Sequence, residues 1–240
     1  MQVTTEGIIL QNIKYGDKKV ILKVFTKHHG LVTFNAFASK SPNSKIKSAS
    51  ILPLQHVELN FILKPNREVQ QLAEANLLYV YNDVSRNYNK LAVSQFLNEV
   101  FIKCIKEQSP NEELFDFMAS SYKWFNESSE DFNNFHICTL FELSKYLGFE
   151  PHNNYNKENL YFDAREGKYT PLSISFPLGF DKTQSQHFLK IFDANLLSQP
   201  LTRAERNDLL ECLLAYYKMH VAGFNELKSY EILKELFNQN

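Results

Sequence analysis

Lysines in two predicted loops are the residues whose type and spacing best suit a chemical task in this chain. The interval 39–50, SKSPNSKIKSAS, combines lysines and serines with a turn at Pro42-Asn43. Lysines are mobile positive charges, and serine hydroxyls donate hydrogen bonds to the same phosphate oxygens. The pattern therefore predicts a phosphate-binding surface. Its predicted contact residues are Lys14, Lys18 and Lys19 in one loop and Lys40, Lys45 and Lys47 in the other.

Charge is divided unevenly along the 240 residues, although the net charge is only −1. Nine lysines, one arginine and five acidic residues give residues 1–80 a charge of +5, which leaves −6 for residues 81–240. This asymmetry indicates a polyanion-binding part next to an acidic part. A solvated lysine-rich surface without a ligand is the alternative interpretation.

The motifs of common catalytic and cofactor sites are absent from the sequence. The seven glycines are too far apart for a dinucleotide-binding, Walker A or nucleophile-elbow motif. His28 and His29 are adjacent on a predicted strand and point to opposite faces, and His152 with Asp163 would give a metal only two ligands. We therefore expect no catalytic centre, no metal and no cofactor, although an enzyme with a site in 150–180 is an alternative.

The three cysteines, Cys104, Cys138 and Cys212, lie far apart in apolar segments and are expected to be buried, reduced thiols. No apolar run is long enough to cross a bilayer, and the N-terminus lacks the apolar region of a signal peptide. We expect a cytoplasmic protein.

An α+β fold is predicted, with residues 1–80 as a barrel domain and residues 81–240 as an α-helical domain. Residues 55–63 alternate between apolar and polar, which is typical of a half-buried strand. Strands are also predicted at 3–11, 19–27, 31–38 and 69–78, and five strands with a loop between the third and fourth match the size of an OB-fold barrel. An open SH3-like barrel has a similar pattern. After residue 81, apolar residues recur every three or four positions and predict helices, with a capping box at Thr202 and Glu205. A loop-rich excursion, with a short hairpin near 160–169, is expected at 150–180.

The opening segment TEGIILQNIKYGDKKVILKVFTKHHGLVTFNAFA resembles the start of the RecO recombination-mediator family, in which a strand ends near T-x-x-H-G. Here those positions are Thr26, His29 and Gly30. The basic loop before Ile51-Leu52-Pro53-Leu54 and the closing segment from Tyr216 to His220 are also similar to that family. The resemblance depends on the order of weak motifs along nearly the whole chain.

This resemblance implies an N-terminal OB-fold that binds single- and double-stranded DNA, and a protein that anneals complementary strands. It implies cooperation with RecR and contact with the C-terminal tail of single-stranded DNA-binding protein, so that RecA is loaded during gap repair at the nucleoid. An acidic tail of that kind requires an apolar pocket with a nearby cation, for which Arg203, Arg206 and Lys218 are candidates. Some relatives carry a four-cysteine zinc module, but residues 150–172 contain no cysteine, so no zinc is expected. An OB-fold module that binds RNA is the alternative function.

Overall fold

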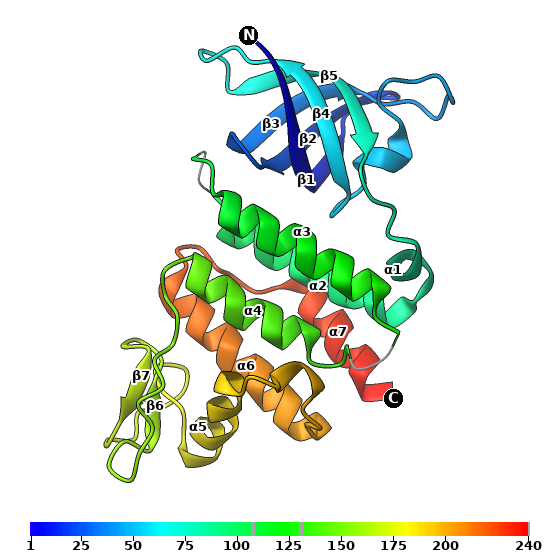
Figure 1. The fold of residues 1–240 in the computed structure, drawn as a ribbon. Helices are drawn as coiled ribbons and strands as arrows, with labels where there is room; N and C mark the ends of the chain where they lie inside the picture. The colour runs from blue at the N-terminus through cyan, green and yellow to red at the C-terminus, as the bar shows by residue number, and fades with distance from the viewer. Residues whose placement is uncertain (107–108, 130–131, 240) are drawn as a thin grey trace. The chain divides into compact units, whose positions relative to one another are not determined.

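The computed structural model describes residues 1–106, 109–129 and 132–239. The chain forms two compact units, Met1–Glu127 and Ser128–Asn240, each of which is described by itself (Figure 1). None of the helices within the described residues has the length and apolar character that a membrane span requires.

Five strands of the first unit close into a barrel in the order β1-β2-β3-β5-β4. Neighbouring strands are antiparallel except β3 and β5, which are parallel. The strands are β1 (Gln2–Lys14), β2 (Lys19–Thr26), β3 (Gly30–Phe37), β4 (His56–Ile62) and β5 (Val69–Leu77). The predicted OB-fold is confirmed.

Alternation along β4 shows why these residues form a barrel. Val57, Leu59 and Phe61 are at most 1% exposed and point into the barrel core, whereas the residues between them face outward. Gly7 on β1 lies so close to β2 and β4 that an added Cβ would meet Val24 at 2.6 Å and Leu59 at 2.7 Å. Glycine is therefore required where β1 packs against the interior.

Three helices complete the first unit: α1 (Asn82–Arg86), α2 (Tyr88–Cys104) and α3 (Glu112–Glu127). The ring of Phe115 on α3 lies 6.0 Å from that of Phe25 on β2 and 5.7 Å from that of His56 on β4. Lys27 at the end of β2 pairs with Asp116 at 2.7 Å. The barrel strands thus end near the predicted boundary at residue 80, but α1 to α3 belong to the same compact unit as the barrel.

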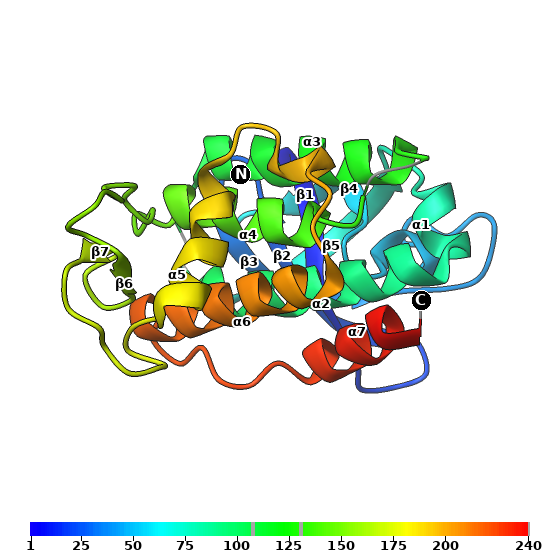
Figure 2. The ribbon, with the colours of Figure 1, turned by 90° about the horizontal axis from the view of Figure 1, so that it is seen from below.

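The second unit is mainly helical. Its helix α6 contacts both α4 and α5 (Figure 2). The elements are α4 (Phe135–Tyr146), the hairpin strands β6 (Tyr161–Asp163) and β7 (Lys168–Thr170), α5 (Lys182–Phe188), α6 (Arg203–His220) and α7 (Lys228–Gln239). At the end of α4, Gly148 has φ +81° and the amide of Phe149 donates to the carbonyl of Ser144, which is the geometry of a glycine-ended helix. The ring of Phe149 packs against Tyr216, Tyr217 and His220 of α6.

Residues 150–180 form an ordered layer around an aromatic cluster. The ring of Phe162 on β6 lies within 4.4 to 5.8 Å of four other rings, those of Tyr169, Phe180, Phe188 and Tyr216. Asn154 holds Tyr169 through two backbone hydrogen bonds, of 2.7 and 2.9 Å. The predicted hairpin is present, and the segment around it packs through rings and backbone hydrogen bonds.

The predicted capping box opens α6, and its carboxylate gives a pH-dependent prediction. Hydrogen bonds from Lys190 and then from Thr202 lower the pKa of Glu205 from 4.5 to about 2. A lowered carboxyl pKa stabilises the fold above pH 4.5, and this contribution is lost as the pH falls towards 2. Glu205→Gln, which can keep the capping box, should cost about 1 kcal/mol at neutral pH. Urea unfolding should show this difference shrinking between pH 4.5 and 2; a difference independent of pH would contradict the assignment.

Candidate nucleic-acid interface

The β1–β2 loop presents the first three predicted lysines. Lys14 ends β1, Lys18 lies in the loop and Lys19 begins β2, and all three side chains are exposed. The loop is closed by a hydrogen bond of 3.1 Å from the amide of Tyr15 to the carbonyl of Lys19. The tight turn therefore holds these three positive charges close together at one end of the barrel.

The segment between β3 and β4 presents the other three, Lys40, Lys45 and Lys47, which are also exposed. Ser44 donates its amide to the carbonyl of Ser41, which confirms the predicted turn at Pro42-Asn43. The interval is not a free loop throughout, because Ile46 is buried and the amide of Ala75 on β5 donates to the carbonyl of Lys45. Two serines act within the turn: Ser39 Oγ accepts from the amide of Ser41, and Ser44 Oγ donates to the carbonyl of Ile46.

Both lysine groups meet at the end of β3. The amide of Ala38 donates to the carbonyl of Lys18 at 2.8 Å, and Ser39 forms an isolated bridge with Lys47. Barrel closure therefore brings all six predicted residues to one end of the barrel, an arrangement that we call the lysine end. Within the part of the chain that the structure describes, none of the six forms an ion pair with a carboxylate. Their role in binding stays a prediction.

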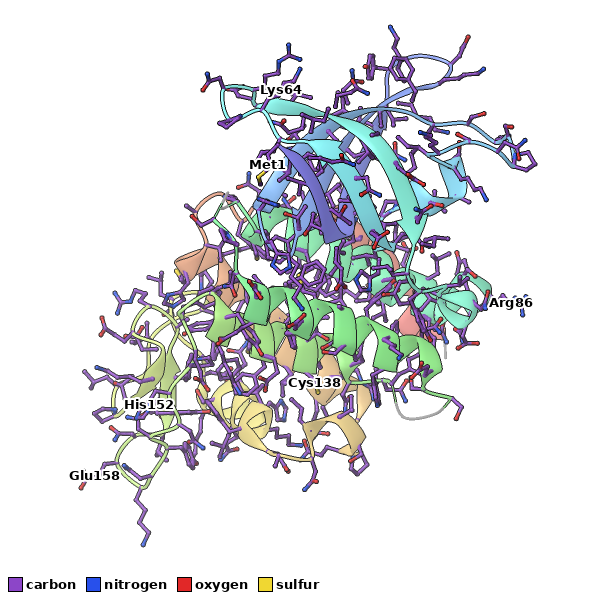
Figure 3. All side chains as sticks on the ribbon, turned by 45° about the horizontal axis from the view of Figure 1, so that its top comes forward. Met1, Lys64, Arg86, Cys138, His152 and Glu158 are labelled. Carbon is purple, nitrogen blue, oxygen red and sulfur yellow. The ribbon has the colours of Figure 1, made fainter. Side chains whose placement is uncertain are left out.

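The sequence did not single out Lys23, Lys64 or Arg67. Lys23 projects from the outer side of β2, and the alternation Lys19, Ile21, Lys23 was the signal for it. Lys64, which Figure 3 labels, and Arg67 are exposed on the β4–β5 turn. The buried side-chain amide of Gln70 donates to the carbonyls of Lys64 and Arg67, at 2.9 and 2.6 Å. In OB-folds, oligonucleotides bind across the β2–β3 face and along the β1–β2 and β4–β5 loops. These three cations lie on that route.

The two histidines of the β2–β3 turn, His28 and His29, each contact another side chain of the first unit. His28 lies 3.2 Å from Glu112 of α3, and the ring of His29 packs edge-on to Phe61. Burial lowers the pKa of His29, which favours its neutral form. The two side chains therefore have separate partners, as expected for adjacent residues that point to opposite faces.

The three cations predicted for partner binding lie in different surroundings in the second unit. Arg206 is engaged within the unit, because it donates to Asn134 and to the carbonyl of Leu201, each at 3.1 Å. Arg203 is exposed in the first turn of α6. Lys218 lines a mainly apolar pocket of about 590 Å³, whose lining includes Phe176, Leu214 and Phe224 and also the carboxylates of Glu211, Glu226 and Glu231. Of the three, Lys218 alone combines exposure with an apolar pocket.

His152 and Asp163, the two candidate metal ligands of residues 150–180, lie in different surroundings. Asp163 is bound by Arg165 at 3.1 Å, and His152 is exposed on the excursion (Figure 3). Although burial opposes ionisation of Asp163, the hydrogen bonds from Arg165 and Glu166 hold the pKa of its carboxyl below its ordinary value. Across the ranges that the structure describes, no three His, Cys, Asp or Glu side chains are grouped so that they could hold a metal ion. Cys104 and Cys212 are buried as predicted, whereas Cys138 is only half-buried. Burial raises the pKa of the Cys104 and Cys138 thiols to about 12, which makes them unreactive.

A closed five-stranded barrel followed by helices defines an OB-fold protein with a helical C-terminal part. The family described as "Recombination protein O N terminal" matches residues 1–81, and "Recombination protein O C terminal" matches residues 85–156. Curated proteins named "DNA repair protein RecO" are similar along the whole chain. That of Flavobacterium psychrophilum is 32% identical over 99% of this chain and 100% of its own, that of Christiangramia forsetii is 31% identical over 99% and 100%, and that of Phocaeicola vulgatus is 27% identical over 98% and 98%. The chain belongs to the RecO family.

Proposed function

We propose that this protein is a DNA-binding recombination mediator of DNA repair. The observation that carries the proposal is the lysine end, where six exposed lysines from two loops meet on an OB-fold barrel. Lysines that neutralise phosphates release counterions, which supports binding to both single and double strands. Two strands held in this way repel each other less and pair more readily, so we propose strand annealing without any bond being made or broken.

The second part of the proposal concerns protein partners. We propose that the protein works with RecR, and that it contacts the C-terminal tail of single-stranded DNA-binding protein, so that RecA is loaded on coated DNA. The pocket at Lys218 offers an aromatic-ended tail an apolar wall and the cations Lys218 and Lys228, whereas Glu211, Glu226 and Glu231 in the same lining oppose its acidic residues. Action on chromosomal DNA implies the cytoplasm, at the nucleoid.

Annealing of coated strands tests the proposal. Complementary strands covered with their cognate single-stranded DNA-binding protein should anneal when this protein is added, and removal of the coating protein's C-terminal tail should abolish that effect. Lys218→Glu should slow annealing of coated strands and leave bare strands unaffected, because its pocket would serve the tail and not the DNA. Lys182→Glu, at another exposed lysine of the second unit, is the matched control.

Two results would overturn the proposal. If full-length coating blocks annealing as completely as tail-less coating, the protein is not a mediator. If RNA competes with DNA more effectively than DNA of the same sequence, the alternative of an RNA-binding module holds, since the 2′-hydroxyl is what separates the two ligands.

A further inference from the structure

Two aromatic rings lie on the outside of the barrel, where apolar side chains are not expected. Tyr15 is 51% exposed and Phe37 is 53% exposed, whereas Phe25 and Phe34 are at most 1% exposed. Phe25 is a packing residue, because its ring lies 6.0 Å from that of Phe115 on α3. An exposed pair of large rings on one surface indicates a binding surface rather than a core.

Strand register places both rings on one face. Lys19 pairs directly with Phe37, and Ile21 with Asn35, and directly paired residues of antiparallel strands point to the same side. Tyr15, at the end of β1, reaches this face because its hydroxyl donates to Asn35 Oδ1 at 2.6 Å. Phe37 and Asn35 are two residues apart on β3, so their side chains share the face.

The ring of Tyr15 is held in place from β3 and β5. Asn35, which accepts its hydroxyl, also donates from Nδ2 to Gln71 Oε1 at 3.3 Å. Phe37 is bounded by Lys19, whose Nζ lies 5.9 Å from the ring centroid. The face is therefore preorganised, with the ring of Tyr15 fixed by a hydrogen bond and one side of the Phe37 ring covered by the Lys19 ammonium, which leaves its other side for stacking.

The charges around the rings suit a nucleic acid strand. The outward strand residues of this face carry no carboxylate; they are Gln11, Ile13, Tyr15, Lys19, Ile21, Lys23, Thr33, Asn35, Phe37, Val69 and Gln71. Asp17 in the β1–β2 loop and Glu68 before β5 are exposed carboxylates beside this set. The lysine end adjoins Phe37 directly through Ser39 and Lys47. A backbone bound at the lysine end would bring its bases onto the rings.

We propose that Tyr15 and Phe37 form a base-stacking platform for single-stranded DNA, with Asn35 as a positioning residue for Tyr15. This inference rests on the proposed function and adds strand selectivity to it. The lysines contact phosphates and accept single or double strands alike. The faces of the bases, however, are available for stacking on protein rings only when the bases are unpaired from the duplex stack.

An oligonucleotide of abasic sites tests the platform, because it keeps the phosphates of oligo-dT and lacks the bases. Tyr15→Ala/Phe37→Ala should lose at least about tenfold in affinity for oligo-dT, since each stacked base contributes ~1–3 kcal/mol. Its affinity for the abasic strand and for duplex should match that of the unchanged protein. The double variant should also keep the salt dependence of binding, because no phosphate contact is removed. Tyr15→Phe and Asn35→Ala should each give a smaller, equal and non-additive loss.

Ile62→Ala is the matched control, since Ile62 is a 57% exposed apolar residue on β4, outside this face. It should bind oligo-dT as the unchanged protein does. Equal affinity of the double variant and the unchanged protein for oligo-dT would overturn the platform while leaving salt-dependent DNA binding intact. If Tyr15→Phe binds like the unchanged protein, the positioning role of Asn35 fails. If the unchanged protein shows no salt-dependent binding to DNA, the proposed function fails, and the platform fails with it.

Discussion

Replacing Lys40, Lys45 and Lys47 together by alanine should weaken binding to every DNA tested and flatten its dependence on salt. Each phosphate contact contributes about −0.7 for single strands and −0.9 for duplex to the slope of log K against log[salt]. Loss of three contacts should therefore reduce the slope by up to about 2 and 3, respectively. Fluorescence anisotropy with labelled oligonucleotides from about 50 to 200 mM salt measures the change.

The control for this variant is a second triple replacement on the other unit, at the exposed Lys157, Lys168 and Lys182. It removes the same net charge and should leave the slope unchanged. A slope that stays the same in the loop variant would show that this loop does not contact DNA. The same loss in both variants would show that net charge, rather than the lysine end, determines affinity.

Phe162→Ala should be the most destabilising single change in the second unit. Phe162 is 0% exposed at the centre of the aromatic cluster, and a cavity of that size costs about 3–5 kcal/mol. Thermal unfolding followed by circular dichroism should show a large loss for this variant. Phe176→Ala, at a 50% exposed phenylalanine of the same excursion, should cost far less.

Treatment with a chelator tests the prediction that the protein binds no zinc and needs none to fold. Dialysis against a chelator should leave the melting temperature of the unchanged protein where it is, and elemental analysis should find no stoichiometric zinc. About one zinc per chain, retained after chelation, would contradict this and would make His152 and Asp163 the first ligands to replace.

Much of the barrel was predictable because its signals are local. The alternation along residues 55–63 identified β4 and its inward face, and residues flanked by turn formers marked the other strands. The middle of β1 was harder to predict from the sequence pattern. Its register shifts between Ile9 and Gln11, and Ile8, Ile9 and Leu10 are all buried, so simple alternation fails there.

The candidate interface depends on contacts that no local pattern encodes. Six lysines were visible in the sequence, but their meeting at one end requires the pairing of β2 with β3 and the bridge from Ser39 to Lys47. Composition also gave no means to separate Tyr15 and Phe37 from Phe25, since exposure is decided by register and by the packing of Phe115. The role of Arg206 likewise became clear only once Asn134, 72 positions away, was seen beside it.

Packing of Phe115 against Phe25 and His56 has a consequence for how such chains are exchanged between genes. A recombination event that moved the strands alone would leave the outer wall of the barrel without its cover and the helix with an apolar ring in water. A crossover after Glu127 would carry wall and cover together, because the first compact unit ends there. Hybrid proteins should therefore be joined after Glu127, at the end of the first compact unit, rather than after β5.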